Sequence, residues 1–256
     1  MQLATWNVNS LNVRLPQVLD WLTAHPVDVL ALQELKLTDD KFPLQVFTDA
    51  GYHAQWFGQK SYNGVALLSK APATDVIKNI PGFEDDQSRV LCATIDGVRV
   101  IGAYFPNGQE PGSDKFAYKM RWLDALREWV RTEMARHPQL VLMGDYNITF
   151  DDDDVWDPEG LRDTIHCTEE ERYHLRALIA LGLILPAFAP RSLIQDLFFI
   201  LTEGGPADAS HVVAWQVYVE TFRKLAFGTG SALAYIMAVA TFVLAYFVIR
   251  STSRKL

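Results

Sequence analysis

A short apolar run that leads directly into polar residues constrains this chain more than any other feature. Leu140 to Met143 are consecutive apolar residues, and Gly144-Asp145-Tyr146-Asn147 follow them. An apolar run of this length without helical spacing predicts a buried strand. Asp145 and Asn147 are two residues apart, so on an extended chain their side chains point to the same side. The alternative interpretation is a turn, because Gly, Asp and Asn are also the commonest turn formers.

Three other predicted strands also end in polar residues. They are Leu3–Val8 with Asn7, Val29–Glu34 with Glu34, and Arg99–Tyr104 with Tyr104. Strands that alternate with helices and carry functional groups at their ends predict an α/β fold. The ends of such strands are where α/β enzymes place their chemistry.

The rest of the sequence up to about Leu183 agrees with this fold class. Apolar spacing predicts two helices, apolar runs predict two further strands, and Asp-Gly predicts a type I′ hairpin turn. A threonine followed by three glutamates predicts a capping box, and a glycine ends the helix that it opens. The two helices are Leu15–Ala24 and Lys115–Arg136, the two strands are Gly64–Ser69 and Val90–Ile95, and the turn is Asp96-Gly97. The capping box opens the helix Thr168–Leu181, and Gly182 ends it. The four acids Asp151–Asp154 predict a solvated loop, with a metal cluster as the alternative.

Charge and cysteine content limit the environment in which this chain works. The formal net charge of −8 argues against broad electrostatic attraction to nucleic acid and leaves room only for a local basic face. Cys92 and Cys167 match no metal or redox spacing, which suits a reducing compartment. The N-terminus lacks the pattern of a signal peptide. We therefore expect residues 1–183 to be cytoplasmic.

The polar groups at the strand ends suit a hard cation. Mg²⁺ prefers oxygen ligands and binds through one or two carboxylates together with a substrate phosphate. Glu34 is the candidate metal ligand, and Asp145 is the candidate to orient or deprotonate a water molecule. Asn7 and Asn147 are candidates to hold a phosphate oxygen or an acid, and the Tyr104 phenol to donate to a phosphate. Each group alone is more simply explained as a solvated strand end, and their joint occurrence favours a site.

Several motifs, in this order, resemble exonuclease III, in the superfamily of Mg²⁺-dependent endonuclease/exonuclease/phosphatases. They are Thr5-Trp6-Asn7-Val8-Asn9, Leu32-Gln33-Glu34-Leu35-Lys36, Tyr62-Asn63-Gly64-Val65-Ala66, Gly102-Ala103-Tyr104-Phe105-Pro106-Asn107-Gly108 and Gly144-Asp145-Tyr146-Asn147-Ile148. Asp157-Pro158-Glu159-Gly160 and Ile165-His166-Cys167-Thr168 also match and lie outside the shared superfamily core. The resemblance is therefore to the DNA-repair branch, and it covers roughly residues 1–183.

This resemblance implies a four-layer α/β sandwich, in which two packed mixed sheets are flanked by helices. It implies a monomer that cleaves phosphodiesters at abasic sites and removes nucleotides 3′→5′ from duplex DNA, with Mg²⁺ as the cofactor and Mn²⁺ as the alternative ion. The implied roles are metal ligand for Glu34, water activation or positioning for Asp145, support of the site for Asn147 and Asn7, phosphate contact for Tyr104, and DNA-backbone contact for Lys119.

After Leu183 the family pattern stops. The family continues with segments that supply further site carboxylates, a histidine paired with one of them, and strands of the second sheet. None of the six histidines of this chain directly follows an aspartate. We therefore expect an incomplete sandwich and an activity that is absent or severely reduced, because losing a catalytic histidine alone costs about 10²–10⁴ in rate.

From about Arg191 the chain resembles a different family, the permease subunits of binding-protein-dependent sugar ABC transporters. Gln195 to Ala209 is similar to the loop before their last membrane helix. Phe227 to Ile249 is 23 residues without a charge, which at about 1.5 Å per residue is long enough to cross a bilayer. A basic tail follows, which is expected on the cytoplasmic side. The alternative is a buried helix of a soluble domain.

Two segments of different origin are therefore expected in one chain. Residues 1–183 are a truncated nuclease-like domain, and residues 184–256 are a permease-like fragment whose helix at 227–249 associates with lipid of the inner membrane. The alternatives are a membrane transport subunit and a non-functional fusion, whether natural, engineered or an error of sequence assembly.

Overall fold

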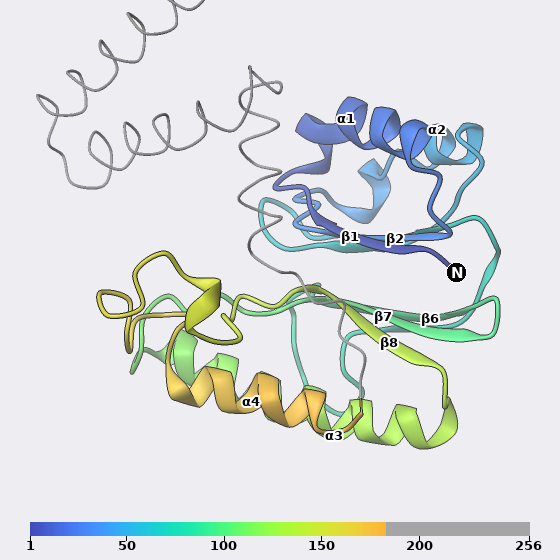
Figure 1. The fold of residues 1–256 in the computed structure, drawn as a ribbon. Helices are drawn as coiled ribbons and strands as arrows, with labels where there is room; N and C mark the ends of the chain where they lie inside the picture. Colours follow the sequence, from blue (N-terminus) through green and yellow to red (C-terminus); the bar gives the residue numbers. More distant parts are fainter. Residues whose placement is uncertain (183–256) are drawn as a thin grey trace, which may run out of the picture. The chain divides into compact units, whose positions relative to one another are not determined.

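The computed structural model describes residues 1–182, which lie within one unit, Met1–Ala187. Two sheets of four strands each pack face to face in this part of the chain, and helices cover the outer face of each sheet (Figure 1). Each sheet contains both parallel and antiparallel pairs. The predicted α/β arrangement of two mixed sheets flanked by helices is therefore confirmed.

The first sheet is built from the N-terminal part of the chain. Its strands, in spatial order, are β1 (Leu3–Asn7), β2 (Val29–Gln33), β4 (Val65–Ser69) and β3 (His53–Phe57). β1 and β2 are parallel, and the other two pairs are antiparallel. The helices α1 (Leu11–Ala24) and α2 (Leu44–Asp49) lie on its outer side (Figure 1). The 3₁₀ turn η1 (Asp39–Lys41) precedes α2 in the chain.

The second sheet follows in the chain and is ordered by sequence. Its strands are β5 (Ala73–Lys78), β6 (Val90–Ile95), β7 (Val98–Tyr104) and β8 (Leu140–Asp145). Only β7 and β8 are parallel, because the long helix α3 (Asp114–Arg136) connects them. The 3₁₀ turn η2 (Asp152–Asp154) and the helix α4 (Glu169–Ile179) complete the described chain, and α3 and α4 lie outside this sheet (Figure 1).

The alternation of side chains along the strands separates the core into layers. It also decides which polar side chains at the strand ends point between the two sheets. On β8, Val141 and Met143 pack between the two sheets, whereas Leu142 packs toward α3. Side chains on a strand alternate between its faces, so Asp145 continues the row that faces the first sheet. On β1, Leu3 belongs to the inter-sheet core, and Asn7 lies on the same face of its strand. The polar ends of both strands therefore point into the space between the sheets.

The hairpin predicted at Asp96-Gly97 is confirmed. These two residues join β6 to β7, and both have positive φ values, 49° and 80°, as a type I′ turn requires. The capping box is also present, because Thr168 accepts from the backbone of Glu171 and the Glu171 side chain accepts from the backbone of Thr168.

Three elements were not predicted, and two of them are sheet edges. β3 and β5 each pair with a single strand among the described residues, and most of β5 is exposed. Their residues therefore lack the continuous apolar pattern on which the prediction depended. The third is the short helix α2. Two predicted boundaries shift by more than one residue, because α1 begins at Leu11 rather than Leu15, and α4 ends at Ile179 rather than Leu181.

The predictions for the C-terminal segment lie outside the described residues. They are the boundary near Leu183, the permease-like fragment at 184–256 and the membrane helix at 227–249. Within residues 1–182, every helix is too short or too polar to cross a membrane.

Candidate functional site

Four strands, two from each sheet, end close together and supply the polar side chains of the candidate site. β1 ends at Asn7, β7 ends at Tyr104, β8 ends at Asp145, and Glu34 directly follows β2. In the described chain β1 and β8 are the edge strands of their sheets, and β1 pairs with β2 while β8 pairs with β7. The site therefore depends on the packing of one sheet against the other.

The side-chain amide of Asn7 links the two carboxylates. Its Nδ2 donates to Glu34 Oε1 at 2.8 Å and to Asp145 Oδ2 at 2.7 Å. Its Oδ1 accepts from the backbone N–H of Asn9 at 3.0 Å, which sets the orientation of the amide. Two acids that share one donor concentrate negative charge at the strand ends, and such a site favours a cation.

Glu34 is held in its ionised form by its neighbours. The residue has a left-handed backbone with φ of 57°, because the chain turns sharply where β2 ends. Lys36 Nζ lies 2.8 Å from Glu34 Oε2. Burial works to raise the pKa of Glu34, but hydrogen bonds from Asn7, Lys36 and Tyr104 outweigh it and keep the pKa below its ordinary value.

Tyr104 is kept as a protonated phenol. Burial raises the pKa of its hydroxyl far above the ordinary range, and the charges of Glu34 and Asp145 act in the same direction. The guanidinium of Arg89 lies 5.1 Å from the centre of the Tyr104 ring, and Arg89 Nη1 donates to the Tyr104 carbonyl at 3.3 Å. The ring is thereby supported from one side, and its hydroxyl serves as a hydrogen-bond donor.

The arrangement of Asp145 and Asn147 differs from the extended strand end that was expected. β8 ends at Asp145, and Asn147 has a left-handed backbone with φ of 47°. The predicted strand is therefore confirmed up to Asp145, and Asn147 lies in the turn that follows it. The turn still joins the two residues, because the Asn147 backbone N–H donates to Asp145 Oδ1 at 3.1 Å. The Asn147 side chain donates to the carbonyl of Phe105 at 3.0 Å, which ties the ends of β7 and β8 together.

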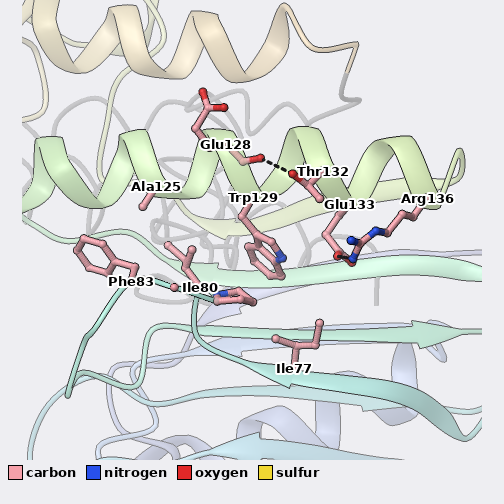
Figure 2. Close-up of a pocket in the computed structure, with 11 residues that line it drawn as sticks. Ile77, Ile80, Phe83, Ala125, Glu128, Trp129, Thr132, Glu133 and Arg136 are labelled. Carbon is pink, nitrogen blue, oxygen red and sulfur yellow. Dashed lines mark hydrogen bonds and ion pairs between the residues drawn. The ribbon is translucent and has the colours of Figure 1, made fainter.

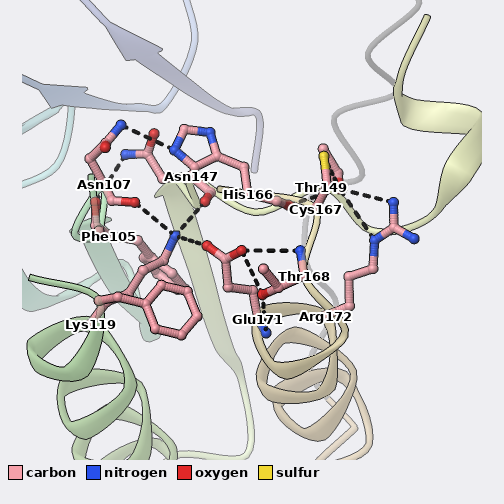
Figure 3. Close-up of polar contacts among 12 residues, drawn as sticks. Phe105, Asn107, Lys119, Asn147, Thr149, His166, Cys167, Thr168, Glu171 and Arg172 are labelled. Carbon is pink, nitrogen blue, oxygen red and sulfur yellow. Dashed lines mark hydrogen bonds and ion pairs between the residues drawn. The ribbon is translucent and has the colours of Figure 1, made fainter. Parts of the chain in front are cut away.

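Lys119 does not face solvent, which argues against the DNA-backbone contact expected for it. Its side chain is fully buried and lies 2.5 Å from Glu171 Oε1. Figure 3 shows its ammonium group surrounded by that carboxylate and by backbone carbonyls. The position was visible in the sequence, because Lys119 lies on the same helical face as Phe116 and Leu123, which are both buried.

Three further polar residues, which we did not assign to the site from the sequence, lie near it. Lys36 pairs with Glu34, and its place two residues later in the same motif was an available signal. Asn107 Nδ2 and His166 Nε2 are 3.1 Å apart (Figure 3). Burial and the nearby charge of Lys119 lower the pKa of His166. No local pattern connects His166 to residue 107.

The donors present at this site fit a hard divalent cation. Within residues 1–182, no three His, Cys, Asp or Glu side chains are grouped closely enough to hold a metal ion by themselves. Mg²⁺ does not need such a cage, because it binds through one or two carboxylates while keeping water and phosphate oxygens. Glu34 supplies one such carboxylate, and Asp145, which Asn7 joins to it, lies beside it. Asp151–Asp154 instead form an exposed turn, in which Asp152 pairs with Arg172 at 2.7 Å.

A cavity of about 470 Å³ lies elsewhere, between α3 and the segment that follows β5 (Figure 2). Ile77, Ile80, Phe83 and Trp129 give it apolar walls, and Arg136 lies at one end. None of the candidate site residues lines this cavity. We therefore assign the chemistry to the strand ends, where the carboxylates converge.

Comparison with known proteins relates this sequence and fold to a family that includes nucleases. The sequence profile of the Endonuclease/Exonuclease/phosphatase family matches residues 4–216. The match therefore continues past Leu183, into the segment that we expected to be unrelated. The exodeoxyribonuclease III of Haemophilus influenzae is 32% identical over 161 residues, which are 60% of this chain and 60% of the relative. The aligned part thus spans less than two thirds of that relative.

Two solved structures resemble this chain in both fold and sequence. The 3′ phosphatase NExo from Neisseria, bound to a product DNA hairpin, has a TM-score of 0.70 and 50% identity, and 71% of each chain is covered. An AP endonuclease from Archaeoglobus fulgidus has a TM-score of 0.68 and 33% identity, with 71% of this chain and 70% of the other covered.

Proposed function

Because this chain belongs to the Endonuclease/Exonuclease/phosphatase family, we propose that it hydrolyses phosphodiester bonds of duplex DNA, at abasic sites and from 3′ ends. The observation that carries the proposal is the amide of Asn7, which holds the carboxylates of Glu34 and Asp145 side by side between the two sheets. The names of the exodeoxyribonuclease III and AP endonuclease relatives support DNA as the substrate.

The proposed division of labour follows from the contacts of each group. Glu34 would hold Mg²⁺, or Mn²⁺ as the alternative, and the bound cation would stabilise negative charge on the scissile phosphate. Asp145 orients the attacking water and accepts its proton, because both of its oxygens are already fixed by donors, one from Asn7 and one from the backbone of Asn147. The water oxygen then bonds to phosphorus as the bond to the leaving sugar oxygen breaks.

Tyr104 and the two asparagines act on the substrate phosphate in this proposal. The raised pKa of Tyr104 keeps a proton on its hydroxyl, so the group donates to a phosphate oxygen. Asn7 and Asn147 support the carboxylate pair and the turn beside it. Lys119 takes no part in binding DNA, because its ammonium group is buried.

A second candidate reaction is removal of a 3′-terminal phosphate from DNA. The observation that favours it is the 50% identity to the Neisseria protein NExo, which one structure describes as a 3′ phosphatase and another as a 3′-5′ exonuclease, compared with 33% for the AP endonuclease. Both reactions use a water nucleophile on a phosphorus atom, so the same carboxylate pair would serve either. The difference lies in the phosphorus, which carries a second ester bond to the DNA chain in the phosphodiester and carries only the ester to the 3′ oxygen in the terminal phosphate.

A single assay tests both reactions. The full chain is incubated with Mg²⁺ and three duplexes, which carry an abasic site, a 3′ phosphate or a plain 3′ end. Asp145→Asn is the matched control, and loss of the proton acceptor is expected to lower the rate by about 10²–10⁴. Product formation that equals this control on all three duplexes contradicts nuclease activity in this chain. The expectation of absent or severely reduced activity is the opposite outcome of this assay, and clear cleavage above the Asp145→Asn control would refute it.

The expectations for residues 184–256 need separate tests. If a helix at 227–249 spans the inner membrane, alkaline carbonate extraction leaves the protein in the membrane pellet, and release into the supernatant contradicts the span. Reading the encoding DNA across codons 183–191 tests for a junction between two genes. A single uninterrupted gene in an independent clone contradicts an artificial fusion.

A further inference from the structure

A fully buried ion pair lies directly behind the candidate site. Lys119 of α3 and Glu171 of α4 are both completely buried, and Lys119 Nζ is 2.5 Å from Glu171 Oε1. Removing two charges from water is costly, and apolar replacements of such pairs are often neutral or stabilising. Apolar side chains would therefore pack α3 against α4 equally well, and packing alone does not explain a charged pair at this position.

The ammonium group of Lys119 also holds the backbone of two loops. Its Nζ donates to the carbonyl of Asn147 at 2.7 Å and to the carbonyl of Asn107 at 3.2 Å (Figure 3). An ammonium group has three hydrogens, and together with Glu171 these acceptors use all of them. Asn147 is the residue whose backbone N–H donates to Asp145, and Asn107 lies three residues after Tyr104.

Glu171 is itself fixed at the start of α4. Its Oε2 accepts from Thr168 N at 3.2 Å and from Thr168 Oγ1 at 2.8 Å, as part of the capping box. One carboxylate oxygen therefore serves the helix cap and the other serves Lys119. The position of the ammonium group is consequently set by the N-terminus of α4, a feature remote from the strand ends in sequence.

We propose that Lys119 and Glu171 are positioning residues, which hold the loops after β7 and β8 so that Asp145 and Asn147 keep the geometry needed at the site. The inference of an effect on catalysis rests on the proposed function. The inference about loop geometry does not, because it concerns hydrogen bonds within the protein.

A second buried pair provides a matched control. Arg99 Nε lies 2.8 Å from Glu133 Oε2, and the two side chains are 2% and 4% exposed. This pair joins the start of β7 to the last turns of α3. The other acceptors of Arg99 are the carbonyl of Asp75 and the hydroxyl of Thr94, which lie in β5 and β6 and not in a loop of the site.

The test compares two double variants that remove one buried pair each. Lys119→Met with Glu171→Gln leaves no unpaired buried charge and keeps the capping box, because Gln is also suitable at that position. Arg99→Met with Glu133→Gln is the control. Amide hydrogen exchange is then followed by mass spectrometry in peptides covering residues 105–109 and 145–149, and global stability is measured by urea denaturation.

We expect exchange in these two peptides to become at least about tenfold faster in the Lys119/Glu171 variant, because the carbonyls lose a charged donor. In the control variant the same peptides are expected to keep their rates relative to the rest of the chain. Equal changes in both variants, or unchanged exchange in the first, would overturn the proposal. If the double variant does not fold, Glu171→Asp is measured, which keeps the buried charge pair but shortens the carboxylate by one methylene, and a smaller increase confined to the same peptides is expected.

Activity measurements separate this inference from the proposed function. Where the chain cleaves DNA, the Lys119/Glu171 variant is expected to lower kcat about tenfold or more with little change in KM, because neither residue touches substrate. A change in KM alone contradicts positioning of the catalytic groups. If the chain does not cleave DNA, only the proposed function is contradicted. The exchange experiment still tests whether Lys119 and Glu171 hold the two loops.

Discussion

Asn7 and Asp145 are joined by a hydrogen bond of 2.7 Å, although 138 positions separate them in sequence. Asn7 is the last residue of β1 in one sheet, and Asp145 is the last residue of β8 in the other. The same Asn7 nitrogen also donates to Glu34. The carboxylate pair therefore exists as a pair only when the two sheets are packed against each other.

Replacing Asn7 by alanine removes the donor that both carboxylates share. We expect the pKa of Glu34 to rise, since one of the hydrogen bonds that lower it is lost, and any DNA cleavage to slow by about 10- to 100-fold, as a hydrogen bond to a charged group is worth about 1.5–3 kcal/mol. A ¹³C NMR titration of the Glu34 carboxyl carbon checks the first effect. Gln45→Ala, which removes an exposed amide on α2, is the control, and an identical Glu34 titration in both variants contradicts the assignment.

The lowered pKa of Glu34 predicts how stability depends on pH. A carboxyl whose pKa is lower in the folded state than its ordinary value of 4.5 stabilises the fold above pH 4.5. This contribution is lost as the pH falls below 4.5 through the folded-state pKa. In the Glu34→Gln variant the free energy of unfolding should therefore fall less steeply as the pH is lowered, measured by urea denaturation between about pH 3 and 7. The control Glu159→Gln, in an exposed loop, should keep the steep fall of the unmodified protein. Equally steep falls in the two variants would refute the prediction.

Gly144 is required where β8 approaches β7 beside the site. Its φ is 153°, and a Cβ at this position would lie 1.8 Å from the carbonyl oxygen of Ala103. Backbone cannot move aside without breaking the strand pairing, so we expect Gly144→Ala to lower the free energy of unfolding by more than about 4 kcal/mol. Gly51→Ala is the control for backbone conformation, since its φ is 83° but a Cβ meets nothing within 4 Å. That change should cost only about 1–2 kcal/mol. Similar losses in both variants would rule out the clash.

Phe105 supports the site from the core of the second sheet. Its side chain is fully buried and packs edge-on against Trp122 and Tyr146, with ring centres 5.0 and 5.1 Å away. We expect Phe105→Ala to lower the free energy of unfolding by about 3–5 kcal/mol, because it leaves a cavity in a packed core. Phe150→Ala, at a residue 42% exposed, should change it by less than about 0.5 kcal/mol. A comparable effect of the two changes in urea denaturation would contradict the assigned packing.

Local pattern was sufficient for the parts of this protein that depend on neighbouring residues. The apolar run before Asp145 predicted β8, Asp96-Gly97 predicted the hairpin, and Thr168 with Glu171 predicted the capping box. The α/β class and the strands β1, β2, β7 and β8 were also predicted from local patterns, although β1 and β2 each end one residue earlier than predicted. Strands β3 and β5 were missed, because edge strands bury too little surface to show a continuous apolar pattern.

Tertiary structure alone decided what the functional groups touch. Lys119 appeared available for DNA, yet its position on the apolar face of α3 places it against Glu171, 52 positions later in the chain. Asn147 was expected to extend a strand, but the turn after Asp145 directs its backbone N–H to the carboxylate instead. The meeting of Asn7 with Asp145 required both sheets to be packed. Sequence spacing determines which way a side chain points from its own element, whereas its partners depend on how distant elements pack together.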